Sequence, residues 1–153
     1  MDAAHAAAPD GSGGVYLSGF TGGILGGPSA GARDAWLARY DAAGNRLWIR
    51  QLGTNSDDYA YGAALDGSGG VYVSGSTAGS LGGPSAGLDD AWFAHYDSAG
   101  NQNWIRQFGT SADDRIYAAA SDGSGGVYVS GVTSGSLGGP SAGGADAWLG
   151  SYD

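Results

Sequence analysis

Hydrophobic residues along this chain fall in short runs, which alternate with small or polar residues and are separated by clusters of Gly, Asp and Ser. Within residues 58–113, four such runs are expected to form strands: Tyr59–Leu65, Val71–Thr77, Asp90–Tyr96 and Gln102–Phe108. Each run has the usual length of a strand, and no stretch keeps a helical period free of glycine. The pattern therefore predicts an all-β fold.

The strongest feature of the pattern is an internal repeat. The motif Asp-Gly-Ser-Gly-Gly-Val-Tyr-x-Ser-Gly begins at Asp10, Asp66 and Asp122, so each copy starts 56 residues after the one before. Such a period indicates a repeat architecture. The repeat divides the chain into three predicted units: 2–57, 58–113 and 114–153. The third unit lacks the counterpart of the last strand of the other two.

Four antiparallel strands in roughly 40 to 56 residues are typical of a β-propeller blade, a sheet stacked face to face with its neighbours around an axis. The segment Asp90–Tyr96 is largely apolar on both sides, as expected for a strand covered on both faces. The predicted fold is thus a β-propeller arc of about 2.75 blades per chain, in three repeats.

Three spaced motifs carry a family resemblance: Asp57–Gly62, Asp66–Thr77 and Asp90–Gly100. Together they resemble the bacterial SBBP β-propeller repeats, and the resemblance covers nearly the whole chain. It departs where Trp replaces the usual Phe and where Gly-Gly-Pro-Ser-Ala-Gly replaces a loop containing Phe-Pro. The resemblance implies an exported, extracellular bacterial protein built of many repeats, and it supplies no catalytic residues.

An open arc of fewer than three blades would leave apolar sheet faces uncovered, because propellers are closed rings of typically four to eight blades. Closure by symmetric assembly is one expectation, with a homodimer giving six blades and a homotrimer nine. A second interpretation is that the chain is a part of a longer propeller. The near-identity of the units also suits a designed or reconstructed repeat protein.

Composition and charge narrow the possible partners. Fifteen acidic residues against six basic ones give a net charge of −9, which offers no electrostatic footprint for nucleic acid or for an anionic membrane. The absence of cysteine excludes disulfides and thiolate metal sites. No segment approaches the roughly 18 apolar residues of a membrane helix, and the first residues lack the basic start of an export signal.

Candidate catalytic chemistry is sparse. The two histidines, His5 and His95, are not repeated in all three units, and nucleophilic catalysis requires a base beside a nucleophile. Aspartates do recur, at Asp10, Asp66 and Asp122. Calcium binding is one interpretation, and hydrogen bonding to turn amides, which the spacing favours, is the other. We expect no enzymatic activity, no cofactor and no metal.

Aromatic and arginine side chains are the remaining candidates for binding. Arg50 and Arg106 follow tryptophans at a two-residue spacing and are expected to stack on rings of the next blade. Trp36, Trp92 and Trp148 recur on third strands near glycine-rich loops, where they are expected to fill wide gaps and are the candidate ligand-binding residues.

The predicted function is a non-enzymatic structural or interaction scaffold, in which short repeat chains assemble with copies of themselves. The alternative is a multivalent, lectin-like propeller with one weak glycan site per blade, in which a tryptophan stacks against the sugar.

Overall fold

A computed structural model describes residues 1–153 and contains eleven strands and no helix. The strands are β1 (Asp2–Pro9), β2 (Val15–Thr21), β3 (Asp34–Tyr40), β4 (Arg46–Leu52), β5 (Asp58–Leu65), β6 (Val71–Thr77), β7 (Asp90–Tyr96), β8 (Gln102–Phe108), β9 (Asp114–Ser121), β10 (Val127–Thr133) and β11 (Asp146–Tyr152). The all-β prediction is confirmed. No helix of the protein is long and apolar enough to span a membrane.

The strands form three antiparallel sheets, in which each strand pairs with its neighbour along the chain. We call them blade 1 (β1–β4), blade 2 (β5–β8) and blade 3 (β9–β11). Of the four strands predicted in the second repeat, three agree with the structure and β5 begins one residue earlier. Blade 3 has three strands, so the outer side of β11 has no paired neighbour.

Pairing registers repeat from blade to blade. A glycine of each second strand lies opposite a tryptophan of the third strand, as in Gly75 and Trp92. A shift in register also interrupts each pairing of first and second strands. The first strand β1 pairs along its length in spite of Pro9, which lies at its end, where a missing amide is tolerated. Equivalent positions in the three blades are therefore directly comparable.

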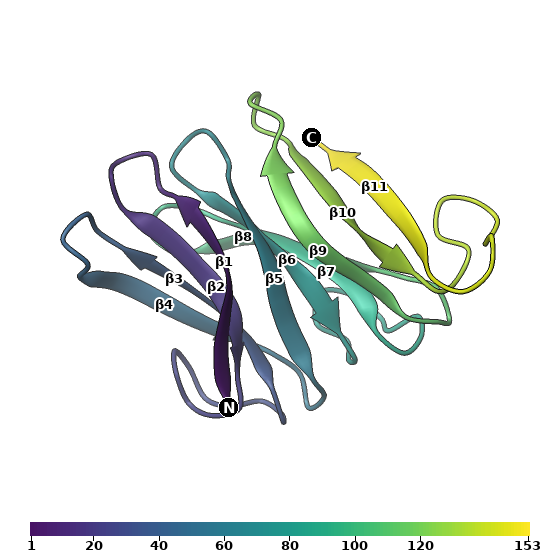
Figure 1. Cartoon of the computed structure of the whole chain (residues 1–153). Helices are drawn as coiled ribbons and strands as arrows, with labels where there is room; N and C mark the ends of the chain where they lie inside the picture. Colours follow the sequence, from purple (N-terminus) through teal and green to yellow (C-terminus); the bar gives the residue numbers. More distant parts are fainter.

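The three sheets stand side by side, and the first strands β1, β5 and β9 contact one another along the chain order (Figure 1). Two apolar clusters fill the spaces between them. The first joins blades 1 and 2 and includes Tyr16, Leu37, Val71, Val73, Trp92 and Tyr96. The second joins blades 2 and 3 and includes Tyr72, Phe93, Ile116, Val127 and Val129. The core thus lies between sheets, as in a stack of propeller blades.

Candidate functional site

Each blade of the stack has two distinct faces. We call the face that contacts the following blade the forward face and the face that contacts the preceding blade the backward face. In blade 2 the forward face carries Tyr72 and Phe93, which pack on blade 3. Its backward face carries Val71, Val73 and Tyr96, which pack on blade 1. Because side chains alternate along a strand, one sequence supplies both faces.

A tyrosine hydroxyl joins each pair of neighbouring blades at one rim. Tyr16 of blade 1 donates a hydrogen bond of 2.5 Å to the carbonyl of Gly69, in the first turn of blade 2. Tyr72 of blade 2 donates in the same way to the carbonyl of Gly125 in blade 3. The hydroxyl gives the apolar contact a fixed register, since a buried tyrosine needs a partner for its O–H.

The forward face of blade 3 has no blade to cover it. Tyr128 and Leu149 lie at the positions of Tyr72 and Phe93 and are 46% and 72% exposed, whereas Tyr72 and Phe93 are 6% and 1% exposed. Ala120 is also exposed here. Large apolar side chains that share one face and lie open to solvent mark a surface suited to association.

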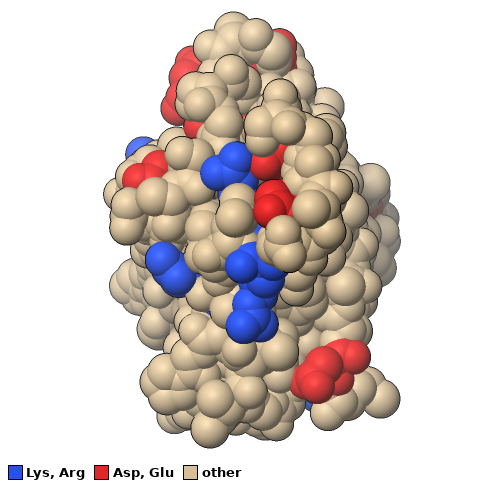
Figure 2. All heavy atoms as spheres, turned by 90° about the vertical axis from the view of Figure 1, so that its left-hand side faces the viewer, with Lys and Arg blue, Asp and Glu red and all other residues tan.

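The backward face of blade 1 is the corresponding surface at the other end. Val15, Leu17 and Tyr40 are only partly buried. Their equivalents in blade 2 are covered by blade 1. Figure 2 views the side of the molecule on which blade 1 lies in Figure 1, where several basic side chains gather near the middle of the view among uncharged residues. The two ends of the stack therefore present the two halves of the interface found twice inside it.

An arginine links the rim of blade 1 to blade 2. Arg39 donates to the carboxylate of Asp10 at 2.8 Å and, through Nη1, to the carbonyl of Ser98 in blade 2. The amide of Ser12 lowers the pKa of Asp10 most; burial opposes this shift, and the Arg39 guanidinium adds to it. The arginine thus links an aspartate turn of blade 1 to the neighbouring blade.

His95 replaces this arginine in blade 2. Its Nε2 lies 2.9 Å from Asp66 Oδ2, and its Nδ1 lies 3.0 Å from the side-chain nitrogen Nδ2 of Asn103. Burial raises the pKa of Asp66, but hydrogen bonds from His95, from Ser68 and from the turn amides outweigh it, so that the pKa is lowered. The imidazole pairs with one carboxylate and holds the aspartate turn against β7.

A hollow of about 470 Å³ adjoins His95, Asp66 and Tyr72 at the boundary of blades 2 and 3. The corresponding position at the boundary of blades 1 and 2 is crossed by Arg39, whose longer side chain reaches Ser98. The imidazole of His95 is shorter than this arginine and does not cross the boundary. His5, the other histidine, packs against the rings of Phe20 and Tyr61.

The recurring aspartates have the turn role that their spacing favoured. Asp66 Oδ1 accepts hydrogen bonds from the amides of Ser68 and Gly70 at 2.7 and 2.8 Å. Asp10 and Asp122 repeat both bonds. The structure brings no group of three His, Cys, Asp or Glu side chains together in a metal-binding arrangement.

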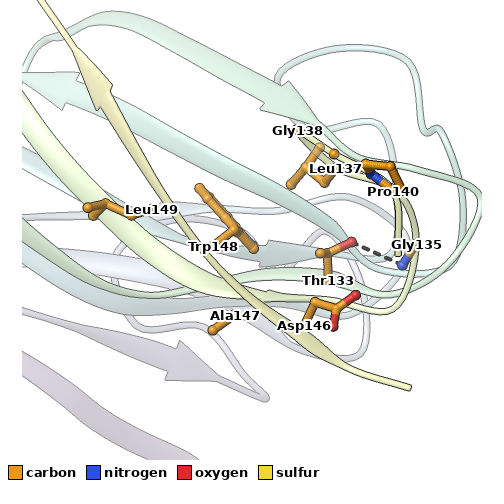
Figure 3. A pocket seen from close by; sticks show the side chains of 10 residues that line it. Thr133, Gly135, Leu137, Gly138, Pro140, Asp146, Ala147, Trp148 and Leu149 are labelled. Carbon is orange, nitrogen blue, oxygen red and sulfur yellow. Dashed lines mark hydrogen bonds between the residues drawn. The ribbon is translucent and has the colours of Figure 1, made fainter. Parts of the chain in front are cut away.

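The three tryptophans predicted to bind a ligand lie in two environments. Trp92 is buried between blades 1 and 2, and Trp36, on the outer side of blade 1, is also buried, with 7% of its surface exposed. Trp148 is partly buried and lines a hollow beside the glycine-rich loop of blade 3 (Figure 3). Burial leaves the first two rings no open face for a sugar, and glycan binding stays a prediction.

The expectation for Arg50 and Arg106 needs a correction. Each guanidinium lies over the tryptophan of its own strand, 5.6 Å from the Trp48 ring and 5.7 Å from the Trp104 ring, and not over a ring of the next blade. Arg50 does reach blade 2, where its Nε donates to the carbonyl of Gly100 at 2.8 Å. The two-residue spacing places both groups on one strand face, which brings them together.

Gln51 and Gln107 are structural residues that the sequence reasoning missed. Each lies on a fourth strand and hydrogen-bonds to the glycine-rich loop of its own blade and to the aspartate that opens the third strand. Their recurrence at the repeat spacing was the signal that would have revealed them.

The repeated four-stranded sheets, the interblade tyrosines and the aspartate turns define a protein of the β-propeller repeat class. Residues 47–83, from β4 through the loop after β6, match the family described as the SBBP β-propeller repeat. The resemblance that the motifs indicated is confirmed for this segment of the chain.

A curated relative gives a second comparison. The chain is similar to the regulatory protein FlaEY of Caulobacter vibrioides, with 32% identity over 142 residues. The match covers 84% of this chain and 15% of the relative. The chain thus corresponds to a small part of that protein's length.

Proposed function

We propose that this chain is a non-enzymatic interaction scaffold that associates head to tail with copies of itself. The observation that supports the proposal is that the open forward face of blade 3 and the open backward face of blade 1 match the two halves of the internal interblade interface. A second copy offers the blade 3 face the same kind of surface that covers Tyr72 and Phe93 within the chain.

The proposed interface has a specific polar contact. Tyr16 donates to the carbonyl of Gly69 and Tyr72 to that of Gly125, so the repeat pairs each tyrosine with a turn glycine of the next blade. In the proposed assembly, Tyr128 donates to the carbonyl of Gly13 in the second copy. The bond adds register to an apolar contact that by itself has little directional preference.

A contact between two different faces is heterologous, so repeated association closes into a ring when the rotation between copies permits it. Two chains give a ring of six blades and three chains a ring of nine. In either ring the apolar faces are covered, while the rim turns and glycine-rich loops stay at the surface. The result is a rigid support that presents repeated loops to other partners.

Solution mass tests the proposal directly. Light scattering on a size-exclusion column, over a hundredfold range of protein concentration, is expected to show a species of two or three times 15.1 kDa. Leu149→Asp places a charge on the forward face of blade 3 and is expected to leave the chain a monomer. Leu88→Asp, on an exposed loop leucine, is the matched control and is expected to assemble normally.

Two outcomes would overturn the proposal. One is a wild-type chain that stays monomeric at every concentration. The other is an assembly that survives Leu149→Asp, because another surface would then hold the copies together. Circular dichroism of both variants verifies that each remains folded.

A further inference from the structure

One backbone contact is repeated at the two internal boundaries of the stack. The amide of Asp58, which opens β5, donates at 2.8 Å to the carbonyl of Arg33, in the loop before β3. The amide of Asp114, which opens β9, donates at 2.7 Å to the carbonyl of Asp89, which precedes β7. Arg33 and Asp89 are equivalent residues of the repeat. The same backbone contact thus carries an arginine at one boundary and an aspartate at the other.

Between blades 1 and 2, the cation comes from the preceding blade. Nη1 of Arg33 lies 2.9 Å from Oδ2 of Asp57 and donates at 3.0 Å to the hydroxyl of Tyr59. Asp57 directly precedes β5, and Tyr59 lies within it. The guanidinium carbon also lies 5.9 Å from the ring centroids of Phe20 and Tyr59, which contact each other edge to face. A carboxylate and two aromatic rings therefore surround an arginine of blade 1.

Between blades 2 and 3, the cation comes from the following blade. Three equivalent positions differ there: Ser76 stands for Phe20, Asp89 for Arg33 and Arg115 for Tyr59. Nε of Arg115 donates at 2.7 Å to Oδ2 of Asp89, and Nη2 lies 2.6 Å from the same oxygen. Asp113, the equivalent of Asp57, lies 3.6 Å from Nη2. The direction of the ion pair is reversed, while the acidic neighbour is kept.

The two sets of side chains are not interchangeable. If a copy of blade 2 followed blade 2, Asp89 would face Asp57 and Tyr59 with no cation between them. If blade 3 followed blade 1, Arg33 would face Arg115. Like charges across a contact disfavour the wrong partner. This discrimination matters in a chain whose repeats are nearly identical in sequence.

We propose that these boundary side chains specify the order of the blades, because each set accepts its own neighbour and rejects the other. The apolar clusters supply the attraction at both boundaries. The side chains of Arg33 and Asp57 are 42% and 33% exposed, and ion pairs so exposed add little attraction. Their effect is on the choice of neighbour. All of these residues lie at internal boundaries, so the inference is independent of self-association.

Replacing the set at the second boundary tests the proposal. Arg115→Tyr alone gives blade 3 the tyrosine of blade 2 and leaves Asp89 facing Asp113 without a cation. It is expected to lower the ratio of folded to unfolded chain at least about fivefold. Adding Asp89→Arg restores a matched set, like that around Arg33, and is expected to return the ratio to within about twofold of wild type. Urea denaturation at low protein concentration measures these ratios.

The reciprocal exchange at the first boundary is an independent test. Tyr59→Arg places a second arginine beside Arg33 and is expected to lower the ratio of folded to unfolded chain at least about fivefold. Adding Arg33→Asp creates an ion pair of the opposite direction. Because Tyr59 also packs on Phe20, we expect this double variant to recover about threefold rather than the whole loss.

Salt and a distant charge reversal are the controls. In about 0.5 M NaCl the difference between each single variant and its double variant is expected to shrink, because salt screens partly exposed charges. Arg46→Asp, at an exposed position of β4 without an ion pair, is expected to have little effect. Double variants no more stable than the single ones would overturn the proposal, since the side chains would then act through packing alone. Equal stability of Arg115→Tyr and wild type would also overturn it.

Discussion

Gln107 shows how much one residue organises in a blade. It makes four hydrogen bonds, three to the loop that precedes β7 and one to the buried Asp90 at the start of β7. We expect Gln107→Ala to lower the free energy of unfolding by about 2 kcal/mol, since each net hydrogen bond contributes roughly 0.5–1.5 kcal/mol and water replaces some of them. Urea denaturation of the two proteins measures the difference.

The control for this change is Arg46→Ala, on an exposed residue of the other fourth strand. It is expected to change stability by less than about 0.5 kcal/mol. Equal effects of the two substitutions would mean that the glutamine hydrogen bonds add nothing beyond ordinary surface contacts.

The aspartate turns give stability a defined pH dependence. Hydrogen bonds lower the pKa of six carboxyls: Asp2, Asp10, Asp41, Asp66, Asp97 and Asp122. A carboxyl with a lowered folded pKa stabilises the fold above its unfolded pKa of 3.8, and this contribution is lost as the pH falls through the folded pKa. Asp58 acts in the opposite direction, because burial raises its pKa.

We therefore expect the free energy of unfolding to fall between pH 4 and pH 2. Asp66→Asn is expected to be less stable than wild type at pH 5 and to lose less on acidification, since it has no carboxyl to protonate there. Urea titrations at several pH values measure both effects. Asp153→Asn, at an exposed position without side-chain hydrogen bonds, serves as the control. Parallel pH profiles for wild type and Asp66→Asn would contradict this account.

At the scale of elements, equivalent positions of β7 and β11 are expected to contribute very differently to the stability of the chain. Phe93 is buried between blades 2 and 3, with ring centroids 5.2 Å from Trp104 and 4.4 Å from Tyr152. Phe93→Ala is expected to cost about 3–4 kcal/mol, since it leaves a cavity between two sheets. Leu149→Ala removes a side chain that is 72% exposed and is expected to cost less than about 0.5 kcal/mol in the monomer.

Thermal and urea unfolding at low protein concentration measure this pair, so that association does not add to the Leu149 value. A similar cost for both substitutions would mean that the forward face of blade 3 is covered even in the single chain. A small cost for both would mean that the contact between blades 2 and 3 contributes little to stability.

The sequence was informative about elements because its signals are local. Alternating runs and glycine turns located β6, β7 and β8, and the repeat at Asp10, Asp66 and Asp122 identified equivalent positions. The predicted start of β5 was one residue too late, because the strand begins at Asp58, the second residue of the acidic pair Asp57-Asp58. Strand boundaries depend on pairing partners that a local pattern does not contain.

The contacts between blades were less accessible to sequence reasoning. Arg50 lies over Trp48 of its own strand. This contact depends on the rotamers of both side chains, and a sequence pattern does not contain them. Trp36 and Trp92 are buried, although the same motif leaves Trp148 beside an open hollow. Trp36 and Trp92 lie on third strands that are paired with a fourth strand, whereas β11, which carries Trp148, has no such neighbour. Identical motifs therefore have different surroundings in different blades.

At the scale of the whole molecule, the three blades form a short stack in which each sheet contacts only its neighbours. In such an arrangement stability is approximately a sum of blade terms and interface terms. The chain has two internal interfaces, and the proposed association would add a third. Adding that interface by association is therefore expected to stabilise the chain in the same way as an internal contact does.

This expectation gives a last prediction, the dependence of thermal stability on protein concentration. If association occurs only in the folded state, each tenfold rise in concentration well above the dissociation constant stabilises each chain by about 0.7 kcal/mol in a dimer and about 0.9 kcal/mol in a trimer. For a chain of this size the midpoint of unfolding should then rise by roughly 1.5–3.5 °C per tenfold step. Scanning calorimetry of the wild type across a hundredfold range measures the rise.

Two variants serve as controls for this prediction. Leu149→Asp should have a midpoint of unfolding that does not depend on concentration. Tyr128→Phe keeps the ring but loses the O–H bond to Gly13 of the second copy, and its midpoint should rise only at higher concentrations. A wild-type midpoint that stays constant while light scattering shows an assembly would mean that the contact does not depend on the folded blade faces.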